Sequence, residues 1–264
     1  MLTYSEEHLK YLKNYHKKKK QVLLTQILII VIFLIIWELL SYFNLINTFL
    51  YSSPSNIIKT IINLIKSNSL LKHIYITSYE TIVSFLISFI GGLIIAIILW
   101  WNKFLAKVFN PYLTIINSLP KVALGPLIII WVGASINSII TMSLMISLII
   151  TIINLYNAFT NTNEDYITLL KSFNANKLTI LKKVIIPSNK LNIINIMKIN
   201  MSMNFIGVIM GELLVSKEGL GYLIMYGSQV FNINLVITSV LILAIISTIF
   251  YYLITLIEKH ISKI

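Results

Sequence analysis

Long apolar runs, each close to the length of a membrane-spanning helix, occupy most of this chain. A spanning helix needs about 20 mostly apolar residues. Five apolar runs of about this length occur: 22–43, 76–101, 139–158, 193–215 and 235–257. A sixth span is expected within residues 104–132, broken near Pro120 and Pro126. The pattern therefore predicts an all-α integral membrane protein with six transmembrane helices.

Two features refine this division of the chain. No charged residue occurs between Val122 and Asn163, a stretch too long for one span, and the turn-forming segment at residues 133–137 is the natural break within it. The first run is longer than the apolar core of a signal peptide and is not followed by a small-residue cleavage site, so we expect it to be retained as a helix.

Composition excludes several classes of soluble protein. Hydrophobic residues make up 57% of the 264 residues, charged residues only 11%, and the mean hydropathy is +0.86. Soluble domains are usually about 25% charged. The absence of cysteine excludes disulfide scaffolds and thiolate chemistry. All 21 basic residues are lysine, and they lie between the apolar runs instead of on one basic face, which argues against nucleic-acid binding.

The lysines also predict the orientation, because cytoplasmic loops carry the positive excess. Placing both termini inside leaves Lys121 at membrane depth and only four lysines outside: Lys59, Lys66, Lys72 and Lys217. Residues 1–21 are then a cytoplasmic segment, in which the lysine run at 17–20 anchors the topology and contacts anionic lipid, and residues 22–264 form the membrane domain. The abundance of Ile, Asn and Lys favours an AT-rich bacterial genome, so a bacterial cell membrane is the expected location.

Two segments between the spans have helical periodicity. On the outer side, residues 54–71 carry isoleucines at helical spacing. They predict either an amphipathic helix on the membrane surface or a solvated loop helix. On the cytoplasmic side, the loop at residues 162–190 is unusually long for a compact protein, and such loops are usually functional.

The long loop predicts two short helices joined by a turn. Asn163 is a suitable N-cap, with Glu164 and Asp165 in the first turn. Asn174 tolerates the left-handed backbone of a sharp turn. The apolar positions of the first helix are Tyr166, Leu169, Leu170 and Phe173, and those of the second, which we expect Pro187 to end, are Leu178, Leu181 and Ile185. Such an element either enters the groove of a partner or packs on the membrane surface.

This loop resembles the EAA loop of permease subunits from binding-protein-dependent ABC importers. The family loop has Glu-Ala-Ala, then a glycine four residues beyond the last alanine, then an apolar pair and proline. Aligned on Ser172-Phe173-Asn174-Ala175-Asn176 and Ile185-Ile186-Pro187, this chain has Thr168-Leu169-Leu170 where the family has Glu-Ala-Ala. It also has Asn174 in place of the glycine.

Other segments extend the resemblance over nearly the whole chain, in the family's order. They are Ser53-Pro54-Ser55, Leu119-Pro120-Lys121-Val122-Ala123-Leu124-Gly125-Pro126-Leu127, Trp131-Val132-Gly133 and Gly219-Leu220-Gly221-Tyr222. This set is similar to the sulfonate, nitrate and taurine branch, which usually has a basic residue where this chain has Glu80.

The resemblance implies a type I importer permease that moves a small anionic or heterocyclic solute inward and is not itself an enzyme. It implies three kinds of partner: a pair of cytoplasmic ATP-binding subunits that hold ATP and Mg, an extracytoplasmic solute-binding protein and a second permease copy, most simply as a homodimer. The chain would bind no cofactor, and it has no Gly-Lys dipeptide of a phosphate-binding loop. Coupling to the ATPase is implied for residues 163–186, through Asp165, Thr168, Leu169, Leu170, Phe173, Asn174, Ala175 and Leu178.

Four polar residues are candidates for the pathway or its gate: Glu80, Ser118, Lys121 and Glu212. A charge within a membrane calls for a functional hypothesis because it is costly unless paired. The alternatives are a lysine partner such as Lys72 for Glu80, a structural hydrogen bond for Glu212, and snorkelling for Lys121. Glu38, beside Trp37, is expected at the interface.

Small and polar residues within the spans predict helix packing. Gly207 and Gly211 have the spacing that lets two helices approach closely, within one subunit or across a dimer. Polar side chains at membrane depth either line a path or join helices: Asn117, Ser118, Ser143, Ser147 and Asn154. The four histidines have no ligand spacing, so no metal site is expected. The rivals are a proton-coupled secondary carrier that uses Glu80 or Glu212, and a membrane-embedded enzyme.

Overall fold

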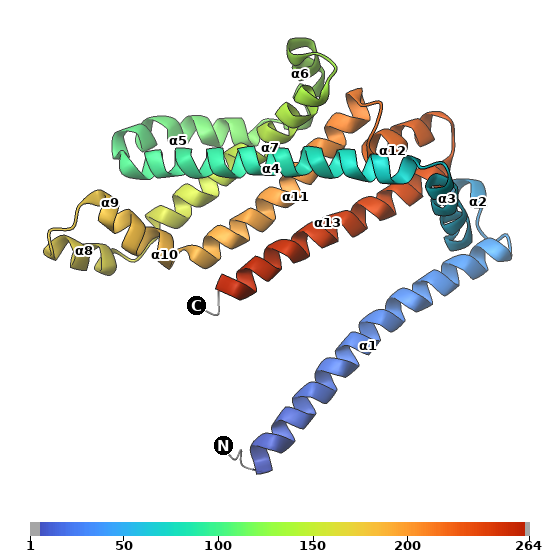
Figure 1. Ribbon diagram of the computed structural model, residues 1–264, viewed down its shortest axis with the longest axis horizontal. Helices are drawn as coiled ribbons and strands as arrows, with labels where there is room; N and C mark the ends of the chain where they lie inside the picture. The colour runs from blue at the N-terminus through green and yellow to red at the C-terminus, as the bar shows by residue number, and fades with distance from the viewer. Residues whose placement is uncertain (1–5, 262–264) are drawn as a thin grey trace.

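The computed structural model describes residues 6–261, with side chains from residue 11 onward except residue 16. Residues 1–5 and 262–264, which belong to the ends of the two predicted regions, lie outside the described residues. The regular structure of the described chain is helical (Figure 1): α1 Glu6–Tyr42, α2 Thr48–Tyr51, α3 Pro54–Lys66, α4 Ser69–Trp101, α5 Lys103–Ser118, η1 Lys121–Leu124, α6 Gly125–Val132, α7 Ile136–Thr160, α8 Glu164–Ser172, α9 Lys177–Ile180, η2 Leu181–Ile185, α10 Ile186–Ser188, α11 Lys190–Val215, α12 Leu220–Gln229 and α13 Ile233–Ile261.

The six predicted spans are present. Among the described residues, five helices are long and apolar enough to cross a membrane: α1, α4, α7, α11 and α13. The sixth span is the pair formed by α5 and the η1–α6 segment, which meet at an angle of 84°. The bend lies at residues 119–120, where Pro120 precedes η1, so the break expected near Pro120 is confirmed. Pro126 does not break the span, because it lies in the first turn of α6.

Several spans are longer than their apolar runs. α1 begins at Glu6, well before Val22, and α4 begins at Ser69 instead of near residue 76. Hydropathy marks the part of a helix that suits lipid, whereas the backbone continues to form i to i−4 hydrogen bonds through polar residues until a cap or breaker ends it. At the start of α4 that breaker is Asn68, which has a left-handed backbone with φ of 53°.

The core is built by α4, α7 and α11, with α12 and α13 packed beside them. α7 lies in the middle and contacts both α4 and α11 extensively. A β-carbon added to Gly211 would lie 2.9 Å from the Ile139 Cα of α7, and one added to Gly207 would overlap the Ser143 backbone. The two glycines therefore bring α11 against α7 within one chain.

Buried hydrogen bonds join the same three helices. The Asn204 carboxamide of α11 donates to Ser88 Oγ of α4 at 3.0 Å and accepts from Ser143 and Ser147 of α7 at 2.8 and 3.1 Å. One turn away, Asn200 Nδ2 donates to Thr151 Oγ1 at 2.5 Å. These bonds satisfy polar groups that lipid would leave unpaired.

The predicted outer helix is present, but it is shorter than expected. α3 ends at Lys66 instead of Leu71, because the left-handed Asn68 separates it from α4. Its apolar positions are divided: Ile57 is buried, and Ile61 and Leu64 pack against the cluster that α4, α11, α12 and α13 share, whereas Ile58, Ile62 and Ile65 are exposed. One side of α3 therefore packs on neighbouring helices, and its position on the membrane surface stays a prediction.

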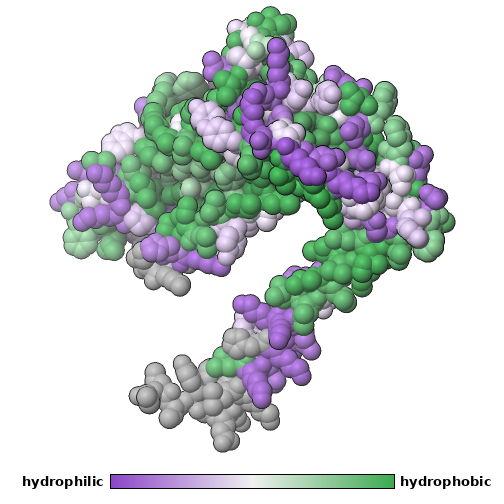
Figure 2. Space-filling model, turned by 45° about the vertical axis from the view of Figure 1, so that its right-hand side comes forward, coloured by the Kyte–Doolittle hydropathy of each residue, from purple (hydrophilic) through white to green (hydrophobic). Residues whose placement is uncertain are grey.

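α1 lies apart from the rest of the bundle. It contacts α3 near its C-terminal end and then runs away from the other helices (Figure 1). Its apolar positions are exposed on all sides. In Figure 2 the C-terminal part of α1 is hydrophobic and its N-terminal part, where the lysine run lies, is hydrophilic. The body of the molecule shows hydrophobic surface with hydrophilic patches across it.

The close contact of α11 with α7 can be tested with two glycine substitutions. Gly207→Ala should lower the free energy of unfolding by about 1–3 kcal/mol, because the new methyl group meets the α7 backbone. Gly91→Ala is the control: its methyl group would lie 3.5 Å from Leu148, so it should be neutral or stabilise by up to about 1 kcal/mol. Thermal unfolding in detergent compares the two variants, and equal unfolding midpoints would contradict the close contact of α11 with α7.

Candidate functional site

Local side-chain caps shape the helix-turn-helix of residues 163–186. Asn163 Oδ1 accepts from Asp165 N at 2.8 Å and begins α8, as predicted. Asn176 Oδ1 accepts from Thr179 N at 2.8 Å and begins α9. Between them Asn174 has φ of 55°, the left-handed turn expected from its residue type. The element is therefore an ordered structure held by its own sequence.

The apolar positions of α8 divide between two faces. Leu170 and Ile167 pack with Ala175 against a buried cluster that includes Phe159 of α7 and Ile185. Tyr166, Leu169 and Phe173 are instead 55%, 56% and 74% exposed. The sequence pattern grouped Leu170 with the exposed residues, because the i, i+3, i+4 and i+7 spacing alone does not separate two adjoining apolar faces of so short a helix.

The second helix of the element continues past its expected end. α9 passes into the π-helical turn η2, in which Ile186 N donates to Leu181 O, and then into α10, so the helix ends at Ser188 and not at Pro187. Pro187 lies in the last turn of this continuous helix, one residue before its end. Asn189 then joins this helix to α11, and its Nδ2 donates to Thr162 Oγ1 at 2.7 Å.

A basic hollow of about 440 Å³ lies beside the helix-turn-helix. Thr168 lines it, together with the aromatic side chains of Trp100, Tyr156 and Phe159 and four lysines: Lys103, Lys107, Lys171 and Lys177. Lys177 Nζ donates to Trp101 O at 2.9 Å and ties α9 to the end of α4. Asp165, Asn174 and Leu178 are exposed on the same element.

A groove lined by asparagines runs between α7 and α11 near this end. It is lined by Asn154, Asn157, Asn161, Asn189, Asn192 and Asn195, with Ala158, Ile196 and Ile199. We call it the asparagine groove. Carboxamides are seldom presented to lipid, because lipid offers them no hydrogen-bond partner.

At the opposite end of the bundle, Glu212 caps the start of α12. Glu212 is 1% exposed, its Oε1 accepts from Thr77 Oγ1 at 2.6 Å, and its Oε2 accepts from Gly221 N at 2.5 Å. Thr77 Oγ1 in turn accepts from Leu220 N at 2.8 Å. Gly219, the N-cap residue of α12, has no side chain to do this. A carboxylate from another helix therefore satisfies the free N–H groups and meets the positive end of the α12 dipole.

Glu80 lies beside Glu212. It is 2% exposed, and it lies one turn along α4 from Thr77, whose hydroxyl donates to Glu212. Its Oε2 and the Ser84 hydroxyl, one turn along α4, have no hydrogen-bond partner among the described residues. Each carboxylate was a candidate by itself from the sequence. Their pairing was missed, although the polar series His73, Thr77, Glu80 and Ser84 on one face of α4 was the available signal.

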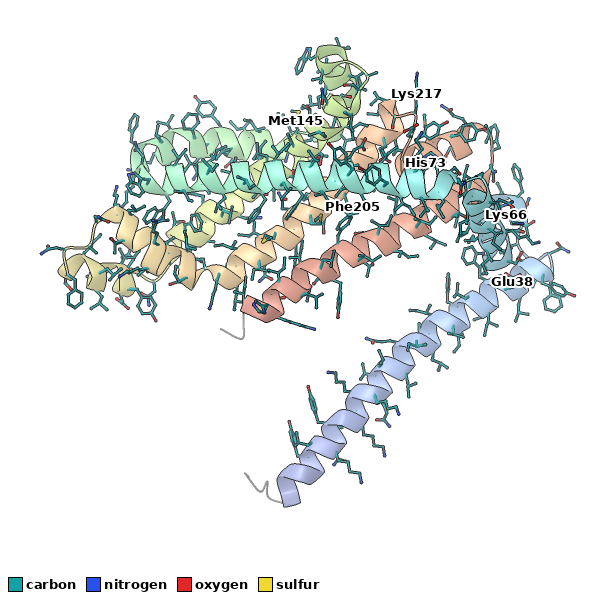
Figure 3. The ribbon with its side chains drawn as sticks, viewed as in Figure 1. Glu38, Lys66, His73, Met145, Phe205 and Lys217 are labelled. Atoms are coloured by element: carbon teal, nitrogen blue, oxygen red, sulfur yellow. The ribbon has the colours of Figure 1, made fainter. Side chains whose placement is uncertain are left out.

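His73 and an ion pair border this acid pair. His73 Nδ1 accepts from Gly219 N at 2.9 Å, and its ring stacks on Tyr222 with centroids 6.0 Å apart (Figure 3). The exposed Lys72 and Glu218 form an ion pair at the surface. Lys72 thus pairs with Glu218 and not with Glu80, the partner that the sequence suggested.

The other predicted polar residues lie elsewhere. Ser118 Oγ donates to Ile115 O within α5, and Lys121 Nζ donates to Asn117 Oδ1 at 3.0 Å and Ile146 O at 3.4 Å. No contact between described residues joins Ser118 or Lys121 to the acid pair. Glu38 caps α3, where its Oε2 accepts from Ser55 N at 3.0 Å (Figure 3).

One further charged contact escaped the sequence patterns. Lys198 of α11 pairs with Glu258 of α13, with Nζ and Oε2 2.6 Å apart, and its Nζ lies 5.3 Å from the centre of the Tyr251 ring. Sixty residues separate the partners in sequence, so only the packing of α13 on α11 brings them together. The described residues contain no group of three or more His, Asp or Glu side chains that could hold a metal ion.

Two isosteric substitutions on α4 test the cap of α12. Thr77→Val should lower the free energy of unfolding by about 1–3 kcal/mol, because Glu212 loses a donor and Leu220 N loses its acceptor. Thr81→Val is equally buried but loses only a bond to Thr77 O within α4, so its effect should stay below about 1 kcal/mol. Thermal unfolding compares the two, and a Thr81→Val effect as large as that of Thr77→Val would refute this account of the cap.

Several known proteins that resemble this chain are named as transport permeases. An ABC transporter permease protein of Haemophilus influenzae is 29% identical over 87% of this chain and 93% of its own length. A protein of Bacillus subtilis named as an aliphatic sulfonates transport permease is 25% identical over 86% and 83%. A formylaminopyrimidine transport permease protein of Halalkalibacterium halodurans is 25% identical over 78% and 81%.

A solved structure shares the fold. The MetNI methionine ABC transporter in an inward-facing conformation contains a chain that matches with a TM-score of 0.65, at 20% identity, over 73% of this chain and 95% of that one. The family model for the inner membrane component of binding-protein-dependent transport systems matches residues 88–263. The chain therefore belongs to this family and is a transmembrane permease of the ABC importer type.

Proposed function

We propose that a separate ATPase subunit docks on the helix-turn-helix of residues 163–186 and drives this permease. The observation that supports this is the exposure of Tyr166, Leu169 and Phe173 on one face of α8, while the other face packs on the bundle. Exposed apolar side chains on an ordered polar loop are expected where a partner surface covers them. ATP and Mg would be held by that partner, and the permease itself would bind no cofactor.

The helix-turn-helix is connected directly to two spans, so it can transmit a force to them. α8 follows α7 after the short link 161–163, and the second helix leads through Asn189 into α11. Leu170 and Ile167 fix α8 to the cluster around Phe159 and Ile185. Because α7 and α11 are also seated on each other by Gly207 and Gly211, a force on α8 would move both helices together.

We further propose a homodimer with the solute path at its interface. The asparagine groove supports this, because its carboxamides need water or protein opposite them and not lipid. The exposed apolar α1 also suits lipid or a second copy. The lysines around α8 and α9 favour a cytoplasmic location for that end, with both termini on the same side. A solute-binding protein would then deliver its cargo at the end that carries α3 and α12.

The proposed solute is a small anionic or heterocyclic molecule. Two of the relatives are named as transport permeases for aliphatic sulfonates and for formylaminopyrimidine. Carboxamide N–H groups donate to sulfonate oxygens, and carboxamides both donate to and accept from the polar edge of a pyrimidine. The asparagine groove therefore has chemistry that serves either class.

A pull-down with paired variants tests the docking surface. Leu169→Asp with Phe173→Asp should abolish recovery of the ATPase subunit from native membranes, because two charges would enter the apolar contact. Leu170 is left unchanged, since it packs in the core. Phe231→Asp, at the other end of the molecule and 70% exposed, is the matched control and should keep the partner. Recovery of the ATPase by the double variant would refute the proposed surface.

Uptake by the reconstituted complex tests the solute class and the energy source. Proteoliposomes that contain the permease, its ATPase and its binding protein should accumulate an alkanesulfonate or a formylaminopyrimidine only when ATP is supplied to the ATPase side. A protonophore should leave the initial rate unchanged. Uptake without ATP that a protonophore abolishes would instead establish the proton-coupled carrier.

A further inference from the structure

We propose that Glu80 and Glu212 form a binding site for one proton, with Glu80 as the protonated partner and Glu212 as the carboxylate. This site lies at the end of the bundle opposite the helix-turn-helix and is independent of ATPase docking. The inference goes beyond the transport function, because it concerns the charge state that keeps α12 in place.

The first step is the charge balance around the pair. Both carboxyl groups are buried, and Glu80 lies one turn along α4 from Thr77, whose hydroxyl donates to Glu212. Two facing carboxyl oxygens form a hydrogen bond only if one carries a proton. Two adjacent buried negative charges without a cation are too costly to persist. One proton removes one of these charges and turns the repulsion into a hydrogen bond.

The second step is to ask whether any neighbouring cation replaces that proton. On α4, Lys72 is paired with Glu218 at the surface, and His73 uses Nδ1 to accept from Gly219 N. α7 carries no charged residue between Ile136 and Thr160, and α12 contributes only the phenols of Tyr222 and Tyr226. No described lysine contacts either carboxyl group, and Lys217 lies in the loop before α12 (Figure 3).

The third step assigns the proton to one partner. Glu212 accepts from Thr77 Oγ1 and from Gly221 N. These donors and the N-terminus of α12 favour its ionised form. Glu80 has no such donors, and its Oε2 has no partner among the described residues. The proton therefore resides on Glu80, which donates it to Glu212.

The consequence is that the attachment of the start of α12 to Glu212 depends on pH. With the proton bound, Glu212 remains in place and keeps the N–H group of Gly221 occupied. It also holds Thr77 Oγ1, which accepts from Leu220 N. Loss of the proton at high pH leaves two facing carboxylates, which separate and release the start of α12. An attachment that depends on one bound proton has an equilibrium constant that falls about tenfold for each pH unit above the pH at which the proton is lost.

Infrared spectroscopy and amide hydrogen exchange of the full chain in lipid nanodiscs test the site. At neutral pH the wild type should show the C=O stretch of a protonated carboxyl group, which Glu80→Gln removes and Glu218→Gln keeps. Above the titration, exchange of the Leu220 and Gly221 amides, corrected for intrinsic chemistry, should quicken about tenfold per pH unit. In Glu80→Gln, whose amide still donates to Glu212, the same amides should stay protected at every pH.

A second variant separates proton binding from mere burial. Glu212→Gln replaces an acceptor oxygen with an N–H donor that faces other donors, so the two amides should lose protection at all pH values. The proposal is overturned if the wild type lacks the carboxyl band, if Glu80→Gln keeps it, or if exchange follows sodium concentration instead of pH. ATPase docking is not measured in these experiments, so their outcome is separate from that of the proposed function.

Discussion

A backbone or side-chain polar group in the bilayer is costly without a partner inside the protein, and the packing of the central helices follows from that constraint. Asn204 bonds to serines of α4 and α7 at once, which fixes the rotation and height of three helices together. Gly207 and Gly211 permit the approach that makes those bonds short. Apolar packing alone, in a lipid environment as apolar as the side chains, would specify this register weakly.

The same constraint explains the two carboxylates that cap helices other than their own. Glu38 of α1 satisfies Ser55 N at the start of α3, and Glu212 of α11 satisfies Gly221 N at the start of α12. In each case an acidic side chain meets the positive end of a short helix that lies beside a span. Both short helices thereby become attached to the bundle, and they lie at the same end of it (Figure 1).

Features governed by local sequence were predictable, whereas features governed by contacts between helices were not. The six spans, the break at Pro120, the Asn163 cap and the left-handed Asn174 each follow from neighbouring residues. The pairing of Glu80 with Glu212 and of Lys198 with Glu258 depends on how one helix is rotated against another, and a single sequence does not contain that rotation. For the same reason the pattern of α8 did not show that Leu170 faces the core and Leu169 does not.

The π-helical turn at Leu181–Ile185 also determines how far α11 is rotated about its axis relative to the helix-turn-helix. A π-turn holds one residue more than the α-helical turn it replaces, and each residue rotates the following helix by about 100°. Deleting one residue there would return the backbone to ordinary helical winding, yet the Gly207 and Gly211 face would then turn away from α7 or α8 would turn away from Phe159. The length of this turn is therefore as strictly constrained as its composition, and related chains should tolerate substitutions within it more readily than insertions or deletions.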